Sequence, residues 1–101
     1  MKILIKDFVK SNTAISYDDG QKCLKYVLKY VDNEQEIILD FKGIDFVITA
    51  FLNPIIGDLI LQKGIIIMKK IKIANANKNI VDKIKIVKDG ALLKREDMQG
   101  L

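Results

Sequence analysis

Short runs of consecutive apolar residues predict the strands of this chain. The clearest run is residues 36–41, where three consecutive apolar residues precede Asp40. A strand that is covered on both faces needs apolar side chains on both, so this run indicates the central strand of a sheet. Residues 2–5 predict a shorter strand buried in the same way. Residues 70–74 alternate and predict another, and part of residues 9–16 could form one more.

A first helix is predicted by apolar residues at helical spacing. Ser16 precedes it, and Asp19 follows three residues later, which is the spacing of a capping box with Asp in place of Glu. We expect the helix to end near Val31. Its apolar face consists of Leu24, Val27, Leu28 and Val31. Cys23 lies beside that face, so we expect it to be a buried apolar residue rather than a nucleophile.

A second helix is predicted up to Gly64, but its start is ambiguous. Thr49 and Asn53 are both N-cap residue types, and they lie only four residues apart. If Thr49 is the cap, Pro54 falls inside the second turn, where it cannot donate the usual hydrogen bond. This predicts an irregular first turn over residues 49–54, with the neighbouring Phe51 or Leu52 partly exposed. The apolar face consists of Leu52, Ile55, Ile56, Leu59 and Ile60.

A third helix is predicted over residues 78–88, capped by Asn75 or Asn77 and ended by Gly90. Its inward residues should be Ile80, Val81, Ile84 and Val87. The preceding residues 65–68 fit either a strand or a packed connection. Residues 91–101 are mixed in character, and we expect them to form a partly mobile tail.

Strands therefore alternate with helices along a chain of 101 residues. This order predicts one α/β domain over residues 1–101, with a small, mostly parallel or mixed sheet of three to five strands and about three helices. Residues Val27, Val31, Ile38, Ile56 and Leu59 should be largely buried.

Candidate chemistry is sparse. The chain has one Cys and no His, which excludes a Ser-His or Cys-His couple and a His-containing zinc site. No glycine-rich phosphate loop is present, since "DDGQK" holds a single Gly. The carboxylates are better explained as helix caps and solvated groups than as a Mg²⁺ site. We therefore expect no enzymatic activity, no cofactor and no metal.

The charge balance leaves one alternative function open. The 17 basic residues exceed the 13 acidic ones, giving a net charge of +4, which a nucleic-acid partner would favour. However, Arg95 is the only Arg, and base and phosphate recognition favour Arg. A Lys-rich nucleic-acid-associated domain is thus the alternative. The N-terminus does not resemble a signal peptide and no apolar run approaches about 20 residues, so we expect a cytoplasmic protein without a membrane segment.

Four stretches resemble the STAS-like domain family DUF4325. They are "SYDDGQKCL" with Asp19 and Gly20, a strand ending in "LDF", the stretch "VITAFLNPIIGDL", and "MKKIKIANAN". Broader relatives are the bacterial STAS domains of anti-sigma factor antagonists, whose corresponding helix begins D-S-S-G and is phosphorylated on a Ser. On that pattern Thr49 matches the first Ser, but Ala50 stands at the phosphorylated position. The resemblance thus leaves Thr49 as the one candidate phosphoacceptor.

The resemblance implies a non-catalytic regulatory module that binds another protein. Its partner would be an ATP-binding anti-sigma or histidine-kinase-like protein, while a structural subunit or a homodimer is a third option. The docking surface would be formed by the loop after strand 36–41 and the start of helix 49–63. The candidate contact residues are Asp40, Lys42, Thr49, Phe51, Leu52, Asn53 and Ile56.

Overall fold

A central parallel sheet organises the fold. The computed structural model describes the backbone of residues 1–99 and the side chains of residues 1–94. Strands β1 (Lys2–Leu4), β3 (Ile37–Asp40) and β5 (Ile71–Ala74) form this sheet in the order β1-β3-β5. Strands β2 (Thr13–Ala14) and β4 (Phe46–Val47) pair in a separate two-stranded ribbon, also parallel. The α/β class and the central position of residues 36–41 are therefore confirmed.

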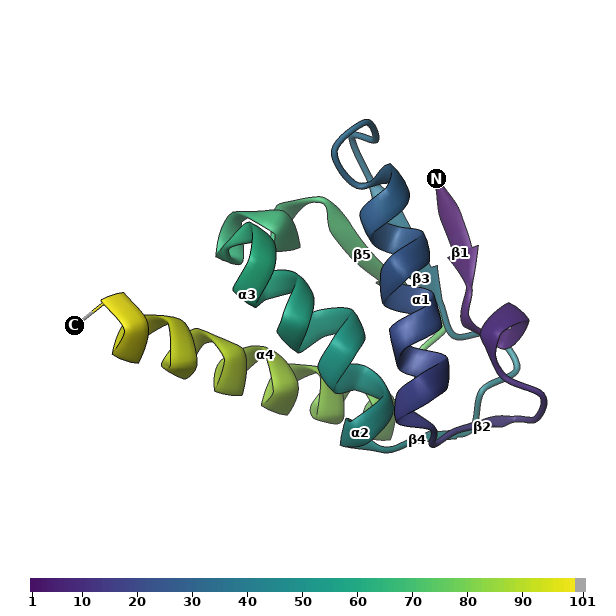
Figure 1. Ribbon diagram of the computed structural model, residues 1–101. Coiled ribbons are helices and arrows are strands. Elements are labelled where there is room, and N and C mark those ends of the chain that lie inside the picture. The colour runs from purple at the N-terminus through teal and green to yellow at the C-terminus, as the bar shows by residue number, and fades with distance from the viewer. Residues whose placement is uncertain (100–101) are drawn as a thin grey trace.

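Three helical rods pack beside the sheet (Figure 1). The first is α1 (Tyr17–Tyr30), which crosses the sheet. The second is a continuous helix made of α2 (Thr49–Leu52), a π-helical segment (Asn53–Asp58) and α3 (Leu59–Lys63). The third is α4 (Lys78–Gln99). Short 3₁₀ turns cover Ile5–Phe8 and Ile65–Lys69.

The helices cover only one face of the sheet. Side chains alternate between faces along a strand, and Ile3, Leu39 and Ile71 of the covered face are all buried. Leu4, on the other face, is 39% exposed. The prediction that residues 2–5 are buried on both faces is wrong, because β1 is an edge strand whose second face no helix covers.

Most of the predicted core is confirmed. Val27, Val31, Ile56 and Leu59 are fully buried, and so is Cys23. Ile38 is only half-buried, because it points to the uncovered face of the sheet between Lys2 and Lys72. An apolar run therefore predicts that a strand is central in the sheet more reliably than it predicts burial of both faces of that strand.

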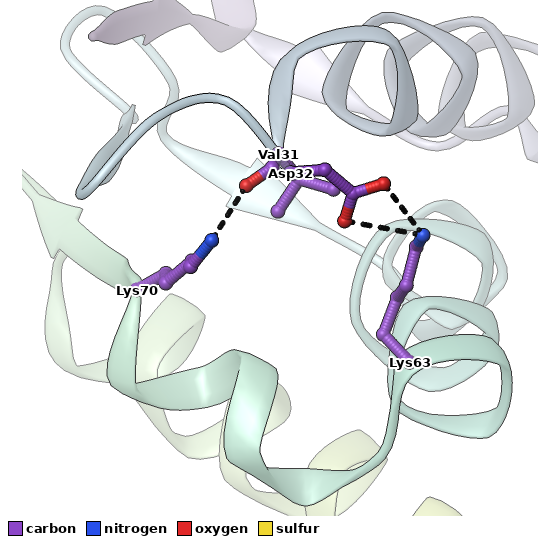
Figure 2. A network of polar contacts seen from close by, with 4 residues as sticks. All are labelled: Val31, Asp32, Lys63 and Lys70. Carbon is purple, nitrogen blue, oxygen red and sulfur yellow. Dashed lines mark hydrogen bonds and ion pairs between the residues drawn. The ribbon is translucent and has the colours of Figure 1, made fainter.

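Both predicted ends of α1 are confirmed. The Oγ of Ser16 accepts a hydrogen bond from the Asp19 N–H at 3.2 Å. At the other end, the Nζ of Lys70 donates to the carbonyl of Val31 at 2.9 Å, and Lys63 forms a 3.0 Å ion pair with Asp32 (Figure 2). A cation at a helix C-terminus is favoured by the free carbonyl groups there. Two lysines from the second helical rod and its following turn thus fasten α1.

The last helix differs from the prediction. Asn77 is the cap, since its Oδ1 accepts from the Ile80 N–H at 3.0 Å. The helix does not stop at Gly90 but continues to Gln99, because a single Gly weakens a helix without having to end it. Val81, expected inside, is 47% exposed. Of the predicted tail, residues 91–99 are helical, and residues 100–101 lie outside the described part.

Candidate functional site

The start of the helix at residue 49 has no side-chain cap. Ile48 occupies the N-cap position in an extended conformation, and Thr49 is the first helical residue. Asn53 is also not a cap, because its N–H donates to the carbonyl of Thr49 inside the rod. Both predicted N-caps are therefore wrong. The residue pattern suggested two starts, and the helix uses neither side chain.

The irregular segment lies one turn later than predicted. It is the π-helical stretch Asn53–Asp58, which contains Pro54. Pro54 has no N–H for the regular helical ladder, and π-helical turns occur where that ladder is interrupted. The predicted cause is thus present in the structure, but residues 49–52 form an ordinary helical turn.

Phe51, Leu52 and Ile56 are fully buried, so the prediction that Phe51 or Leu52 is exposed is wrong. The rod is held between α1 and α4, which both pack against it. Gly20 in α1 allows the close approach, because a Cβ there would collide with the carbonyl oxygen of Phe51. These three side chains belong to the core and are not available to a partner.

Asp40 is also unavailable, since its side chain is only 1% exposed. Its Oδ1 accepts hydrogen bonds from the side chain of Asn75 and from the Lys42 N–H, both at 2.9 Å. Lys2 lies 3.2 Å from Oδ2 as an ion pair, outside hydrogen-bond geometry. The hydrogen bond from Asn75, with that from Lys42, lowers the pKa of Asp40 against the opposing effect of burial. Asp40 therefore joins two loops instead of contacting a partner.

A second set of hydrogen bonds ties the ribbon to its neighbours. The side chain of Asn12 donates to the Asp45 carboxylate at 2.7 Å, and the side chain of Asn77 donates to the Asp45 carbonyl at 3.0 Å. Lys83 of α4 donates to the carbonyl of Val47 at 2.6 Å. These contacts fix β4 against α4 and hold the residues just before Thr49 in one position.

The exposed apolar groups near Thr49 come from the ribbon. Phe46 is 42% exposed and Ile15 is 54% exposed. Phe46 and the half-buried Ile48 point to the same side because side chains alternate along a strand. Ile15 continues β2 beside Ile48, whose N–H donates to the carbonyl of Ala14. The Nζ of Lys83 lies 4.0 Å from the centre of the Phe46 ring. We call Ile15, Phe46, Ile48, Thr49 and Lys83 the ribbon surface.

The structure brings only some of the predicted residues together. Exposed Thr49 and Asn53 line one hollow of about 340 Å³ between the second helical rod and α4. Lys42 is exposed too, but it lines a different hollow of about 540 Å³ between the loops after β3 and β5. Lys42 is therefore separate from the helix start, although its loop leads directly into Phe46.

Comparison with known proteins identifies the family. A family model described as a STAS-like domain of unknown function (DUF4325) matches residues 19–81, which is more than half of the chain. The chain belongs to this STAS-like family. No curated protein and no solved structure gave a match. The matched span starts at Asp19 and Gly20 and includes the second helical rod, so the STAS-like segment contains the close crossing of α1 over Phe51.

Three further observations describe this STAS-like domain. Burial raises the pKa of the Cys23 thiol to about 12, so the group stays protonated. Within the described residues, no three side chains of His, Cys, Asp or Glu are grouped as metal ligands. No helix in that part of the chain is long and apolar enough to cross a membrane.

Sequence reasoning missed Ile15, Phe46 and Lys83. Strand β4 has only two residues, which is too short for alternation to reveal a strand. The one available signal was Phe46 itself, an aromatic residue between Asp45 and Val47. Its exposure depends on the pairing of β4 with β2, which joins segments about thirty residues apart in the chain.

Proposed function

We propose that this STAS-like domain is a non-catalytic regulatory module of the bacterial cytoplasm that binds a protein partner through the ribbon surface. The partner would be an ATP-binding anti-sigma or histidine-kinase-like protein. The STAS-like family membership supports a module of this kind. The class of partner is suggested by the resemblance of the stretch around Thr49 to the helix start of anti-sigma factor antagonists. The proposed contacts are the ribbon surface and Asn53, which lines the hollow beside Thr49. Lys42 would extend the contact from the separate loop that leads into Phe46.

The observation that carries the proposal is an exposed aromatic side chain held in a rigid position. Phe46 is 42% exposed, and Lys83 lies over its ring while also bonding to the Val47 carbonyl. Aromatic residues, Phe included, are enriched at protein interfaces, and a cation over the ring face is attracted to it. The supports of β4 order these groups before binding, which reduces the entropy cost of association.

Thr49 has a distinct place in this proposal. It is exposed at the start of α2, whereas Ala50 has no hydroxyl group. We therefore propose Thr49 as a partner contact and as the only candidate phosphoacceptor at this helix start. A phosphate there would lie beside the free N–H groups of the first helical turn, which favour a negative charge.

The alternative is nucleic-acid binding, and the lysine contacts weaken it. Lys2, Lys63, Lys70 and Lys83 already pair with a carboxylate or a carbonyl of the protein. Those groups hold the fold together, so the basic excess overstates the charge that is free for phosphates. A titration with non-specific DNA tests this alternative, because binding through phosphates weakens steeply as salt increases.

Photo-crosslinking inside cells tests the proposal. A benzophenone amino acid replaces Phe46 in one variant and Tyr26 in the control. Tyr26 is an aromatic residue on α1 with a similar exposure of 39%. We expect position 46, and not position 26, to yield a protein adduct that mass spectrometry identifies as an ATP-binding protein. Equal adducts from both positions, or adducts with nucleic acid only, would refute the proposal.

A further inference from the structure

The turn after the second helical rod exposes large apolar side chains. Gly64 ends the rod with a positive φ of 86°, and the 3₁₀ turn Ile65–Lys69 follows. Ile65 is 45% exposed and Ile66 is 66% exposed, whereas Ile67 is buried and anchors the turn. Two adjacent isoleucines on a fixed turn cost free energy in water, which points to a surface that is covered in use.

These side chains border a shallow, open hollow. Ile65, Ile66, Met68 and Lys69 line one part of it, Lys88 of α4 lines the other, and the space between them is about 520 Å³. Its walls are thus apolar with two ammonium groups among them. An apolar hollow of this kind can take the apolar face of an amphipathic segment laid along it.

The charged side chains that line the hollow have one sign. They are Lys69 and Lys88, and none of the described lining residues is Asp or Glu. The neighbouring stretch 59–81 holds five lysines and no Asp or Glu, although Asp89 follows Lys88 on α4. Lys63 and Lys70 are engaged with Asp32 and with the Val31 carbonyl (Figure 2). Within the described part of the chain, Lys69 and Lys88 have no ion-pair partner. Two uncompensated cations beside apolar walls complement an occupant that is both acidic and apolar.

We propose that this hollow binds an acidic amphipathic segment of a partner protein. One apolar side chain of that segment enters between Ile66 and Met68, and carboxylates beside it pair with Lys69 and Lys88. The like charges of Lys69 and Lys88 disfavour a symmetric pair of identical copies, in which equivalent patches would face each other.

The hollow is distinct from the ribbon surface. Thr49 begins the second helical rod, and Ile65 follows its last residue by two positions, so the two surfaces lie at opposite ends of one rod (Figure 1). The inference therefore does not rest on the proposed function, and variants can disable either surface alone.

Fluorescence anisotropy with labelled synthetic peptides tests the proposal. The probe is a 16-residue helical peptide with Leu at helical spacing on one face and Glu on the other. One control peptide replaces each Glu by Lys, and another replaces each Leu by Ala. We expect saturable binding of the first peptide alone, weakened at least tenfold by either control change and weakened further by salt.

Matched protein variants locate the site. Ile66→Asn and the double variant Lys69→Glu/Lys88→Glu should each weaken peptide binding about tenfold or more. Val81→Asn changes an exposed aliphatic residue outside the hollow, and Lys22→Glu/Lys25→Glu makes the same charge change at two exposed lysines of α1. Both controls should bind like the wild type. Melting temperatures verify that every variant folds. If Ile66→Asn does not fold, Ile66→Ser replaces it.

The proposal fails if the peptide does not bind at concentrations up to about 1 mM, which is the weakest range of recognition. It also fails if the test variants and the control variants lose the same peptide affinity. Vesicles with 30% phosphatidylglycerol and analytical ultracentrifugation serve as competing probes. If Ile66→Asn abolishes vesicle binding or dimerisation while peptide binding is absent, the occupant is a membrane or a second copy instead.

Discussion

Two apolar runs at the two ends of one helical rod have opposite fates. Residues 50–56 precede and enter the π-helical segment, and their large apolar side chains are fully buried. Residues 65–68 follow the other end, and two of their isoleucines are well exposed. Both runs are mostly apolar, so apolar character alone does not explain the difference, and it lies in what packs on each run.

The buried run is covered on two sides, by α1 and by α4. Gly20 lets the α1 backbone approach the carbonyl of Phe51, and Pro54 packs beside it. The exposed run has one buried anchor, Ile67, while the described part of the chain leaves Ile65 45% and Ile66 66% exposed. A close helix crossing therefore determines which apolar run becomes core and which remains at the surface.

Truncating one residue from each run should show the largest contrast. Phe51→Ala should lower the free energy of unfolding by about 3–5 kcal/mol, because it empties a fully buried site. Ile66→Ala should change it by less than about 0.5 kcal/mol, because the side chain is mostly in water. Urea denaturation measures both, and similar losses would show that the two runs are equally packed.

Gly20→Ala should break the crossing that buries the first run. The added methyl group meets backbone, which cannot rotate away, so we expect a loss of about 2–3 kcal/mol. As a control, Gly90→Ala places its Cβ in open space on α4 and should be neutral or slightly stabilising. Thermal unfolding compares the two, and a neutral Gly20→Ala would mean that α1 and the rod are farther apart.

Asp40→Asn should change how stability depends on acid. The folded pKa of Asp40 is lowered, so its ionised form stabilises the fold above the ordinary carboxyl pKa of about 4. That stabilisation is lost as pH falls through the lowered folded pKa. The variant should therefore lose less stability than the wild type as the pH falls below about 4. Parallel acid titrations followed by circular dichroism measure this, and equal losses in the two proteins would contradict it.

Thr49→Ala should have the smallest effect on stability. Its hydroxyl caps no helix, so we expect a change below about 0.5 kcal/mol. Ser16→Ala, which removes the hydrogen bond to the Asp19 N–H, should cost about 0.5–2 kcal/mol. If Thr49→Ala and Ser16→Ala lowered the free energy of unfolding equally, Thr49 would have the capping role that the structure excludes.

The fold was largely predictable because its signals are local. Ser16 with Asp19, the apolar face of α1 and the run at β3 each act within a few neighbouring residues, and each was confirmed. Gly90 misled the prediction because a glycine permits a helix end without requiring one. Helix boundaries beyond that residue depend on packing that the local pattern does not contain.

The candidate site was predicted less well because it depends on distant contacts. The burial of Phe51 is determined by Gly20, about thirty residues earlier, and Asp40 is covered by Lys2 and Asn75 from two other strands or loops. The exposure of Phe46 needs the pairing of β4 with β2. The sequence pointed to the correct helix start, but only the structure separates its core residues from its surface residues.

The most direct test of the proposed docking surface is the affinity of the crosslinked partner, purified and measured by calorimetry. Phe46→Asp should weaken binding at least about tenfold, because it removes a central aromatic contact. Tyr26→Asp, on α1, should bind like the wild type, and both variants should keep their helical content. Unchanged affinity for Phe46→Asp, with Tyr26→Asp equal to it, would contradict the assignment of the ribbon surface.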